Sequence, residues 1–338
     1  MITSADKQAT LEDVARAAGV SHQTVSRVVN NHPNVSQKTR QRVLEAVRAL
    51  AYRPNRTAKG LATNKTGVIG IISFGTSYFG PGQMFTEIEK AVRARGYGLT
   101  LRNIDAPSTT QLQAAIDDLA SHSVDGIVMN APSVDLGTAQ LLSLKRPLPV
   151  VMTDVPKYTR LPSVVLDQTE GVRLATQHLL ELGHEHIAEI SGPLNWYSAL
   201  ERHEAWLATL RSAGLVPGPS RAGDWTAVSG YRATAQLLDT GEPFTGLVVG
   251  NDQMALGALR ALREHDFRVP EDVSVVGFDD IPEASFFEPP LTTVRQDFIA
   301  MGQQTVAYLL TLIQQPQTPQ HQRTLHPQLI ERLSTAQA

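Results

Sequence analysis

The sequence contains no cysteine, no long apolar run and no apolar stretch at its N-terminus. Without cysteine the chain cannot form disulfides, thiolate nucleophiles, or Cys-ligated zinc and iron–sulfur sites. No apolar run approaches the roughly 18 residues that a membrane-spanning helix needs. The first ten residues, MITSADKQAT, lack the apolar core of a secretory signal. We therefore expect a cytoplasmic protein with no membrane segment.

Motifs for nucleotide binding and hydrolysis are also absent. No G-x-G-x-x-G follows the first strand-like run, where GVIGIISFGTS stands, and no G-x-x-x-x-G-K-[ST] loop occurs. The chain has neither a G-x-S-x-G elbow nor an H-E-x-x-H pair. His184 and His186 could suggest a metal, but they follow Gly183, and we interpret them as a helix C-terminal cap. We therefore predict no cofactor, no metal and no enzymatic activity.

The charge of the chain is unevenly distributed. The whole sequence of 338 residues has a net charge of −3 and is 42% apolar and 19% charged, as expected for a soluble protein of two or three domains. Residues 1–62 carry ten Lys and Arg against four acids, a balance of +6, so the remainder carries −9. A basic head on an acidic body indicates a polyanionic partner for the head alone.

Residues 10–30, TLEDVARAAGVSHQTVSRVVN, predict two short helices joined by a tight turn. Thr10 and Asp13 are placed as a capping pair, and Gly19 can adopt the left-handed backbone that ends the first helix. The second helix gathers its valines on one side and presents amide, imidazole, hydroxyl and guanidinium groups on the other. Those groups suit base edges in a DNA major groove. An ordinary helical hairpin is the alternative, and the basic head favours DNA.

A third helix is predicted from Gln37 to about Leu50. Its apolar residues would close a three-helix core: Val43, Leu44, Val47 and Leu50. Ser36 and Thr39 lie at its start, where hydroxyls and free backbone N–H groups hold a phosphate or cap the helix. Residues 56–62, RTAKGLA, are too few for a stable helix alone. We expect this segment to be disordered until something packs against it, or to be a basic linker.

From Gly67 onward the sequence alternates between strand-like and helix-like segments. The strand-like runs are Val68–Phe74, Leu99–Ile104, Gly126–Asn130, Val150–Asp154, Val164–Asp167, Ile187–Ser191, Leu247–Gly250, Val273–Phe278, Thr292–Val294 and a last strand near Thr324–Ile330. Amphipathic helices are expected near 83–95, 109–121, 170–182, 199–213, 228–239 and 252–265. Repeated βα units predict parallel sheets covered by helices, and the number of strands predicts two lobes. Two such lobes place their carboxyl strand ends around one cleft.

Polar residues follow several of these strands directly: Asn130, Asp154, Asn251-Asp252 and Asp279-Asp280. Arg202 and Trp225 lie at a helix start and at a strand-to-helix turn. Sugar hydroxyls form bidentate hydrogen bonds with Asp, Asn and Arg side chains, and the apolar face of a pyranose packs on an indole. Each residue alone is explained equally well as a cap or turn former. Their repetition at several strand ends favours a sugar-binding cleft.

The chain resembles the LacI/GalR family of bacterial transcription regulators. VARAAGVSHQTVSRVVN is the family's helix-turn-helix signature, and the similarity continues through YRPNR, HLLELGHEHIAEISGPL, GDWTAVSGY, NDQMALGALRA, VSVVGFDD and PPLTTVRQDF. It covers the chain from Thr10 to about Leu333. The resemblance implies an α/β fold, with a two-lobed periplasmic-binding-protein-like (type I) effector domain behind an N-terminal three-helix helix-turn-helix DNA-binding domain.

The resemblance also implies domain limits. It places a DNA-binding domain at 1–54, a hinge helix or linker at 55–65 and a sugar-binding and dimerisation domain at 66–338. Lobe 1 would take about 66–167 and 298–323, and lobe 2 about 168–297 and 324–335, with crossovers near Asp167, Asp297 and Thr324.

For the head, the resemblance implies binding to operator DNA. His22, Gln23 and Arg27 are expected to meet base edges. Phosphates or adjoining edges would be contacted by Ser21, Thr24, Ser26, Asn30, Ser36 and Thr39. Residues 55–62 match the family's hinge helix, which folds on the operator. Within it, Asn55, Ala58 and Leu61 are expected at the DNA, with Leu61 wedged into the minor groove.

For the body, the resemblance implies a sugar effector. The expected polar and stacking contacts are Asp154, Arg202, Trp225, Asn251 and Asp279, supported by Asn130 and Gln296. The expected walls are Tyr78, Pro81, Met84 and Phe298. Because the polar set is complete, a galactoside is the expected effector.

Four departures from the family pattern limit these expectations. His22 stands where the most similar members have Tyr, which leaves the operator sequence open. Leu166 replaces a Phe, and Tyr78 is bulkier than the expected aliphatic residue, which leaves the aglycone or second sugar open. The chain stops soon after Leu333 without a leucine-heptad helix, so we expect a homodimer.

We therefore predict a repressor that binds a palindromic operator and is released by a sugar. A regulator for another sugar, or one that acts with a corepressor, is the nearest alternative. A transport-type sugar-binding protein and an enzyme of sugar metabolism are the alternatives from other classes.

Overall fold

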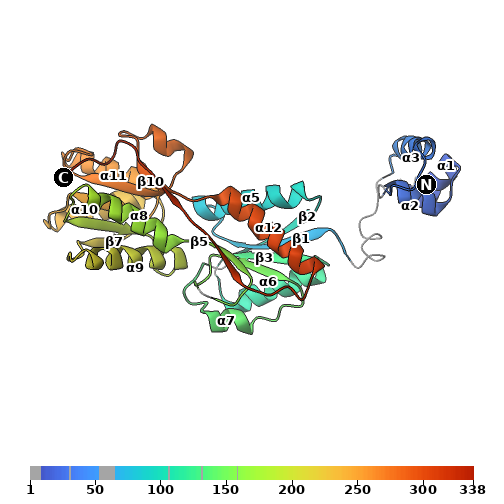
Figure 1. Ribbon diagram of the computed structural model, residues 1–338, viewed down its shortest axis with the longest axis horizontal. Helices are drawn as coiled ribbons and strands as arrows, with labels where there is room; N and C mark the ends of the chain where they lie inside the picture. The colour runs from blue at the N-terminus through green and yellow to red at the C-terminus, as the bar shows by residue number, and fades with distance from the viewer. Residues whose placement is uncertain (1–8, 30–31, 53–64, 106, 131, 158) are drawn as a thin grey trace, which may run out of the picture. The chain divides into compact units, whose positions relative to one another are not determined.

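The computed structural model describes residues 9–338 apart from 30–31, 53–64, 106, 131 and 158. The chain divides into two compact units, Met1–Thr66 and Gly67–Ala338 (Figure 1). Among the described residues, no helix is both long enough and apolar enough to cross a membrane.

The first unit consists of three helices, α1 (Leu11–Ala18), α2 (His22–Val29) and α3 (Gln37–Ala49). The predicted capping pair is present. The Thr10 backbone N–H donates to Asp13 at 2.9 Å, and the Asp13 N–H donates to the Thr10 hydroxyl at 3.3 Å. Gly19 ends α1 with φ 61°, the left-handed conformation that the sequence predicted.

The core of this unit is built around three fully buried valines, Val14, Val25 and Val43. Two predicted core residues, Leu44 and Leu50, are instead 41% and 37% exposed, so that part of the prediction is wrong. Leu44 lies about 100° around the helix from Val43 and points away from the core. Leu50 is the C-cap of α3, and the chain then turns at Ala51, which has φ 45°. This turn buries Tyr52 in the core, whereas Leu50 stays exposed.

In the second unit, the first sheet has the strand order β11-β5-β4-β3-β1-β2, and all its strands are parallel. Its strands are β1 (Val68–Phe74), β2 (Gly98–Ile104), β3 (Gly126–Asn130), β4 (Val150–Thr153), β5 (Ser163–Leu166) and β11 (Gln322–Leu325). Helices α5 (Phe79–Ala94) and α12 (Phe298–Gln314) pack on one face. Helices α6 (Thr109–Ser121) and α7 (Thr138–Ser143) pack on the other. We call this sheet and its helices lobe 1.

The second sheet has the order β12-β10-β9-β8-β6-β7, and only its β10–β12 pair is antiparallel among the pairs described. Its strands are β6 (Ile187–Ser191), β7 (Ser220–Ala222), β8 (Gly246–Val249), β9 (Ser274–Asp279), β10 (Thr292–Arg295) and β12 (Gln328–Ile330). One face carries α8 (Gln168–Glu181) and α9 (Tyr197–Ser212). The other carries α10 (Ala227–Asp239), α11 (Asp252–Glu264) and the short 3₁₀ helix η1 (Pro282–Phe286). This is lobe 2.

The chain passes between the lobes three times, after β5, after β10 and after β11. The last crossover corrects the sequence prediction. Thr324 was expected to begin a single strand of lobe 2, but Thr324 pairs with Val165 in lobe 1, and β12 begins only at Gln328. Pro327 lies between the two strands and has no backbone N–H to continue a ladder. The crossover therefore falls at residues 326–327.

Candidate functional site

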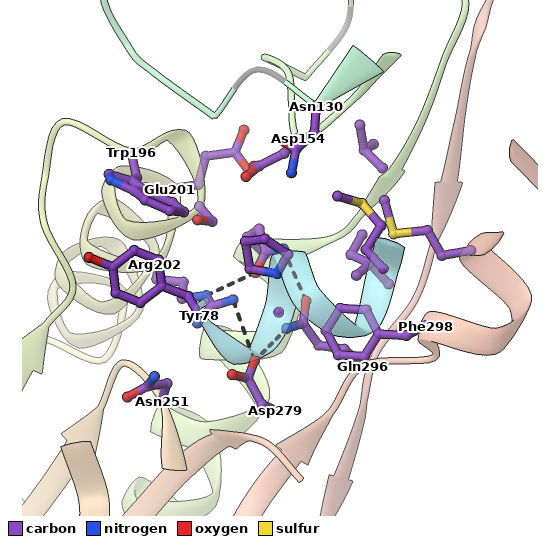
Figure 2. A pocket seen from close by; sticks show the side chains of 18 of the residues that line it. Tyr78, Asn130, Asp154, Trp196, Glu201, Arg202, Asn251, Asp279, Gln296 and Phe298 are labelled. Carbon is purple, nitrogen blue, oxygen red and sulfur yellow. Dashed lines mark hydrogen bonds and ion pairs between the residues drawn. The ribbon is translucent and has the colours of Figure 1, made fainter. Parts of the chain in front are cut away.

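A cavity lies where the carboxyl strand ends of the two lobes face each other (Figure 2). Its volume is about 760 Å³, including the solvent-filled space at its open mouth. It contains every effector contact that the sequence predicted. These residues are Tyr78, Pro81, Met84, Asn130, Asp154, Arg202, Trp225, Asn251, Asp279, Gln296 and Phe298. The structure thus brings together side chains separated by more than 200 residues in the sequence.

Strand ends place most of the polar groups in the cavity. Asn130 ends β3, Asp154 follows β4, and Asp279 ends β9. Asn251 follows β8 and caps α11, because its side-chain oxygen accepts the Met254 backbone N–H at 2.9 Å. The capping explanation and the position in the cavity therefore both apply to Asn251.

Three cavity residues have a left-handed backbone. Asp154, Trp225 and Asp279 have φ values of 51°, 73° and 109°, and they are three of the seven such non-glycine residues in the described part of the chain. Conformations of this kind cost about 1–3 kcal/mol each and concentrate at functional sites. The strain therefore supports a ligand-binding role for this cavity.

A closed ring of polar side chains forms one end of the cavity. Arg202 Nε donates to Gln168 Oε1 at 2.9 Å, and Gln168 Nε2 donates to Gln296 Oε1 at 3.1 Å. Gln296 Nε2 donates to Asp279 Oδ1 at 2.5 Å, and that oxygen lies 3.9 Å from Arg202 Nη2. Arg202 Nη1 also donates to the Gly250 carbonyl at 2.5 Å. We call Arg202, Gln168, Gln296 and Asp279 the polar ring; it fixes each group before any ligand binds.

Aromatic rings flank the guanidinium of Arg202. Its central carbon lies 3.7 Å from the centre of the Phe278 ring and 5.5 Å from that of Trp225. Cation–π attraction of this kind is stronger when the cation is desolvated. Burial also lowers the pKa of Arg202, although the nearby Asp279 opposes that shift.

Burial raises the pKa of each carboxyl group in the cavity. The pKa of Asp279 rises to about 6, although Arg202 and the Gln296 hydrogen bond oppose the shift. The pKa of Asp154 also rises to about 6, again opposed by Arg202. The pKa of Glu201 rises to about 7 because of burial, with a further increase from Asp154 and an opposing effect of Lys157. These groups change charge near neutral pH.

Two buried side chains of the cavity lack hydrogen-bond partners among the described residues. Neither the amide nitrogen nor the amide oxygen of Asn130 is bonded, and Asn130 is only 3% exposed. The indole N–H of Trp225 is also unpartnered. Since buried polar groups are nearly always hydrogen-bonded, these atoms are available to a polar ligand.

The two lobes are tied together beside the cavity. Tyr197 at the start of α9 donates its backbone N–H to the Pro132 carbonyl at 2.7 Å and its hydroxyl to the Leu136 carbonyl at 2.9 Å. Val134 donates its N–H to the Asn195 carbonyl at 3.0 Å. We call this set of bonds the rim latch.

Sequence reasoning missed several cavity residues. They are Phe79, Gly80, Val155, Lys157, Val165, Gln168, Trp196, Ser198, Glu201 and Met301. Helical spacing could have found one of them, because Ser198 lies four residues before Arg202 on the same face of α9. Leu166, noted as a departure from the family pattern, also lines the cavity.

In the first unit, α2 exposes most of the side chains predicted to contact DNA. Ser21, His22, Gln23 and Arg27 are exposed, whereas Thr24 and Ser26 are partly buried. Predicted contacts at Asn30, Asn55, Ala58 and Leu61 lie outside the described residues.

Hydroxyl groups cap α2 and α3 in the same way. The Thr24 backbone N–H donates to the Ser21 hydroxyl at 3.2 Å, and the Thr39 N–H donates to the Ser36 hydroxyl at 3.3 Å. Capping is therefore present, and it leaves other backbone N–H groups of each helix start for a phosphate.

Comparison with known proteins shows to which family the chain belongs. Residues 10–55 match the profile described as bacterial regulatory proteins, lacI family, and residues 176–335 match a periplasmic binding protein-like domain. The chain is 38% identical over 329 residues to the lactose operon repressor of Escherichia coli (strain K12). The aligned region covers 97% of this chain and 91% of that protein. The chain belongs to the lacI family.

Solved structures of lacI-type regulators have the same fold. The lac repressor dimer bound to operator and the anti-inducer ONPF matches with a TM-score of 0.90 and 37% identity, over 98% of this chain and all of that one. The transcriptional regulator CelR in complex with cellobiose matches with a TM-score of 0.71 and 32% identity, over 97% of this chain and all of that one.

For this lacI family member, the predicted fold class is confirmed by both sheets and by the solved structures. The similar proteins are transcriptional repressors and not enzymes, so the prediction of a DNA-binding regulator without enzymatic activity is confirmed too.

Proposed function

We propose that the protein is a repressor that binds a palindromic operator as a homodimer and is released when a galactoside occupies the cavity between its lobes. The observation that carries the sugar assignment is the prearranged polar ring beside Trp225. Carboxylate, amide and guanidinium groups in fixed positions can bond a specific pattern of hydroxyls, while the indole packs on the apolar face of the ring.

Two observations support the galactoside assignment. The polar and stacking residues of the cavity are of the types expected in lactose-repressor-like sequences, and the chain is similar to a lactose operon repressor. Cellobiose is the second candidate, because the structurally similar CelR binds that sugar.

The operator assignment is supported by α2, whose exposed face combines His22, Gln23 and Arg27. The lac repressor dimer that matches this chain is bound to its operator, which supports a dimer reading two half-sites one helical turn apart. A protein that binds operator DNA acts in the cytoplasm.

Release follows from the position of the cavity. A sugar that contacts both lobes stabilises one lobe arrangement over others, and the arrangement that it stabilises is the one that binds operator weakly. The body thus controls the affinity of the head.

The experiment uses the full chain and an operator selected from randomised duplex DNA, with binding followed by fluorescence anisotropy. Titration with methyl galactosides, methyl glucosides and free sugars should release the operator, with a galactoside the most effective. Operator binding that no sugar changes would contradict the sugar-released repressor.

Trp225→Ala should abolish the sugar response and leave operator binding within about twofold, because the indole lies in the second unit and has no part in the DNA-binding helices. Gly192→Ala offers an independent variant, since a methyl group at Gly192 would overlap the indole of Trp225. A normal sugar titration in both variants would remove Trp225 from the site.

A further inference from the structure

Two aspartates stand where the chain passes from a strand of one lobe into a helix of the other. Asp167 follows β5 and is the N-cap of α8, and Asp297 follows β10 and is the N-cap of α12. Each carboxyl group accepts a backbone N–H of its helix, from Glu170 at 3.0 Å and from Ala300 at 2.8 Å. We call Asp167 and Asp297 the hinge aspartates.

The hinge aspartates share a backbone conformation. Asp167 has φ −76° and ψ 87°, and Asp297 has φ −84° and ψ 78°. The N-caps of α1, α3, α5, α6, α7, α9, α10, α11 and η1 have ψ between 135° and 168° instead. Hinge residues of moving domains lie at the ends of such elements, where they absorb changes in φ and ψ. The two aspartates are therefore suited to act as pivots between the lobes.

Among the described residues, only one of the hinge aspartates is paired with a cation. Lys157 Nζ forms an ion pair and a hydrogen bond with Asp167, and only 19% and 17% of these two side chains is exposed. The ring of His326, at the third crossover, lies 3.8 Å from the other carboxylate oxygen of Asp167. Burial alone would raise the pKa of Asp167, but the hydrogen bonds from Lys157 and Glu170 outweigh burial and lower it.

Lys157 belongs to lobe 1 but contacts two helices of lobe 2. It lies in the segment between β4 and β5, and its ammonium group reaches Asp167 at the start of α8. Its backbone N–H donates to the carboxyl group of Glu201 on α9. Both Lys157 and Glu201 line the cavity. A rotation of the lobes about Asp167 would therefore change both contacts.

The polar ring connects the same crossovers to the cavity. Gln168 follows Asp167 directly, and Gln296 precedes Asp297 directly. The two glutamine side chains are bonded to each other at 3.1 Å, and both line the cavity. A sugar bound at the polar ring therefore contacts the neighbours of both pivots.

We propose that Lys157 is a positioning residue for the sugar response. Its ion pair with Asp167 holds one pivot in the arrangement in which both lobes line the cavity, whereas Asp297 has no such restraint. This inference rests on the proposed function. A sugar that contacts both lobes needs that arrangement, and the arrangement that it stabilises binds operator weakly. The ion pair therefore raises sugar affinity and favours release of the operator.

Asparagine separates the charge of Asp167 from its capping role. Asn is as good an N-cap as Asp, so Asp167→Asn retains the bond from Glu170 and loses the charge that holds Lys157. Lys157→Met retains a side chain of similar length and loses the ammonium group. Asp297→Asn is the matched control, because it makes the same change at the pivot whose carboxyl group caps α12.

The test measures sugar affinity by isothermal titration calorimetry on the full chain. Methyl β-galactoside, methyl β-glucoside and cellobiose are compared, and the variants are titrated with the one that wild type binds most tightly. Asp167→Asn and Lys157→Met should each weaken binding about three- to tenfold, as expected for a partly buried ion pair. Asp297→Asn should stay within about twofold of wild type, because no ion pair is lost.

A double-mutant cycle separates the ion pair from general damage to the structure. The variant with both Asp167→Asn and Lys157→Met should bind the sugar no more weakly than either single variant, since both changes remove one interaction. Lys157→Arg restores a cation and should recover most of the lost affinity. The sugar concentration that releases half of the operator, followed by anisotropy, should rise in the variants whose sugar binding is weakened.

The inference is overturned if Asp297→Asn weakens sugar binding as much as Asp167→Asn does, or if the two effects add in the double variant. It is also overturned if every variant binds the sugar as wild type does. In each of these cases a wild type that is released by sugar leaves the proposed function standing. A wild type that binds none of the three sugars overturns both.

Discussion

Arg202 organises one end of the cavity from a single buried position. Its guanidinium bonds Gln168 and the Gly250 carbonyl, pairs with Asp279 and lies over the Phe278 ring. A lysine could supply the charge but not this planar set of donors. The fixed geometry therefore depends on arginine, and a sugar meets groups that need little rearrangement.

The exposed face of α2 leads to a prediction about sequence reading. Gln23→Ala should cost about 1–3 kcal/mol on the cognate operator and relax specificity at one base step, because an amide that bonds a base edge is lost. Competition anisotropy against operators changed at one position measures this. Gln41→Ala, an exposed glutamine of α3, is the control. An equal loss of affinity for random DNA would show that Gln23 contacts only the sugar–phosphate backbone of the DNA.

Buried carboxyl groups predict how stability depends on pH. Burial and the neighbouring Asp279 raise the pKa of Asp252 to about 8, and its carboxyl accepts the Ile281 N–H at 2.8 Å and the Thr293 hydroxyl at 2.5 Å. Because its folded pKa lies above its unfolded pKa, the stability that this group contributes is present below about pH 4 and is lost as the pH rises through 8. Asp154 and Asp279, with pKa values near 6, act in the same direction.

The ligand-free protein should therefore melt at a lower temperature at pH 8.5 than at pH 6. Asp252→Asn retains the neutral form and should reduce that decrease by at least about 2–4 °C, the shift expected per kcal/mol in a domain of this size. Differential scanning fluorimetry across the pH range measures it, with the exposed Asp239→Asn as control. A pH profile of Asp252→Asn that is parallel to wild type would contradict the assignment.

At the scale of elements, apolar runs were enough to predict most strands of the second unit, because strands covered on both faces contain few polar residues. Four elements were missed for physical reasons. Strand β7 is a short, partly exposed edge strand, α7 has six residues and the 3₁₀ helix η1 has five. Helix α12 has the apolar run AYLLTLI, whose continuity hides the helical period.

The cavity residues likewise divide into those that could be predicted from the sequence and those that could not. Asn130, Asp154 and Asp279 could be predicted because each stands at the end of a strand, a position visible in the sequence. Trp196 and Glu201 could not, because Trp196 is the N-cap of α9 in lobe 2, Glu201 lies on that helix, and both line the cavity only because the two lobes face each other. That arrangement is a tertiary property without a local sequence signal.

The rim latch predicts a coupling between one hydroxyl group and sugar affinity. Tyr197→Phe removes the hydrogen bond to the Leu136 carbonyl, a contribution of about 0.5–1.5 kcal/mol. If the sugar binds between lobes held in this arrangement, its affinity should fall about two- to tenfold, measured by calorimetry. Tyr231→Phe is the control, because that hydroxyl bonds Glu264 within lobe 2. Unchanged affinity in Tyr197→Phe would show that the latch plays no part in binding.

At the scale of the whole molecule, the head and the body are separate units joined by a short segment, yet the proposed function makes their binding reactions interdependent. The sugar should weaken operator binding by a certain factor, and saturating operator should weaken sugar binding by the same factor. Anisotropy measures the first factor and calorimetry with and without operator measures the second. Two factors that differ beyond error would exclude a simple two-site coupling.

The left-handed backbone at Asp154, Trp225 and Asp279 also determines which positions are suitable for redesigning the effector. Replacing these residues by other chiral side chains retains the backbone strain and discards the contacts for which the strain is tolerated. Tyr78, Trp196 and Glu201 line the same cavity, and none of them has a positive φ. A biosensor for a new sugar should therefore be evolved first at these three positions.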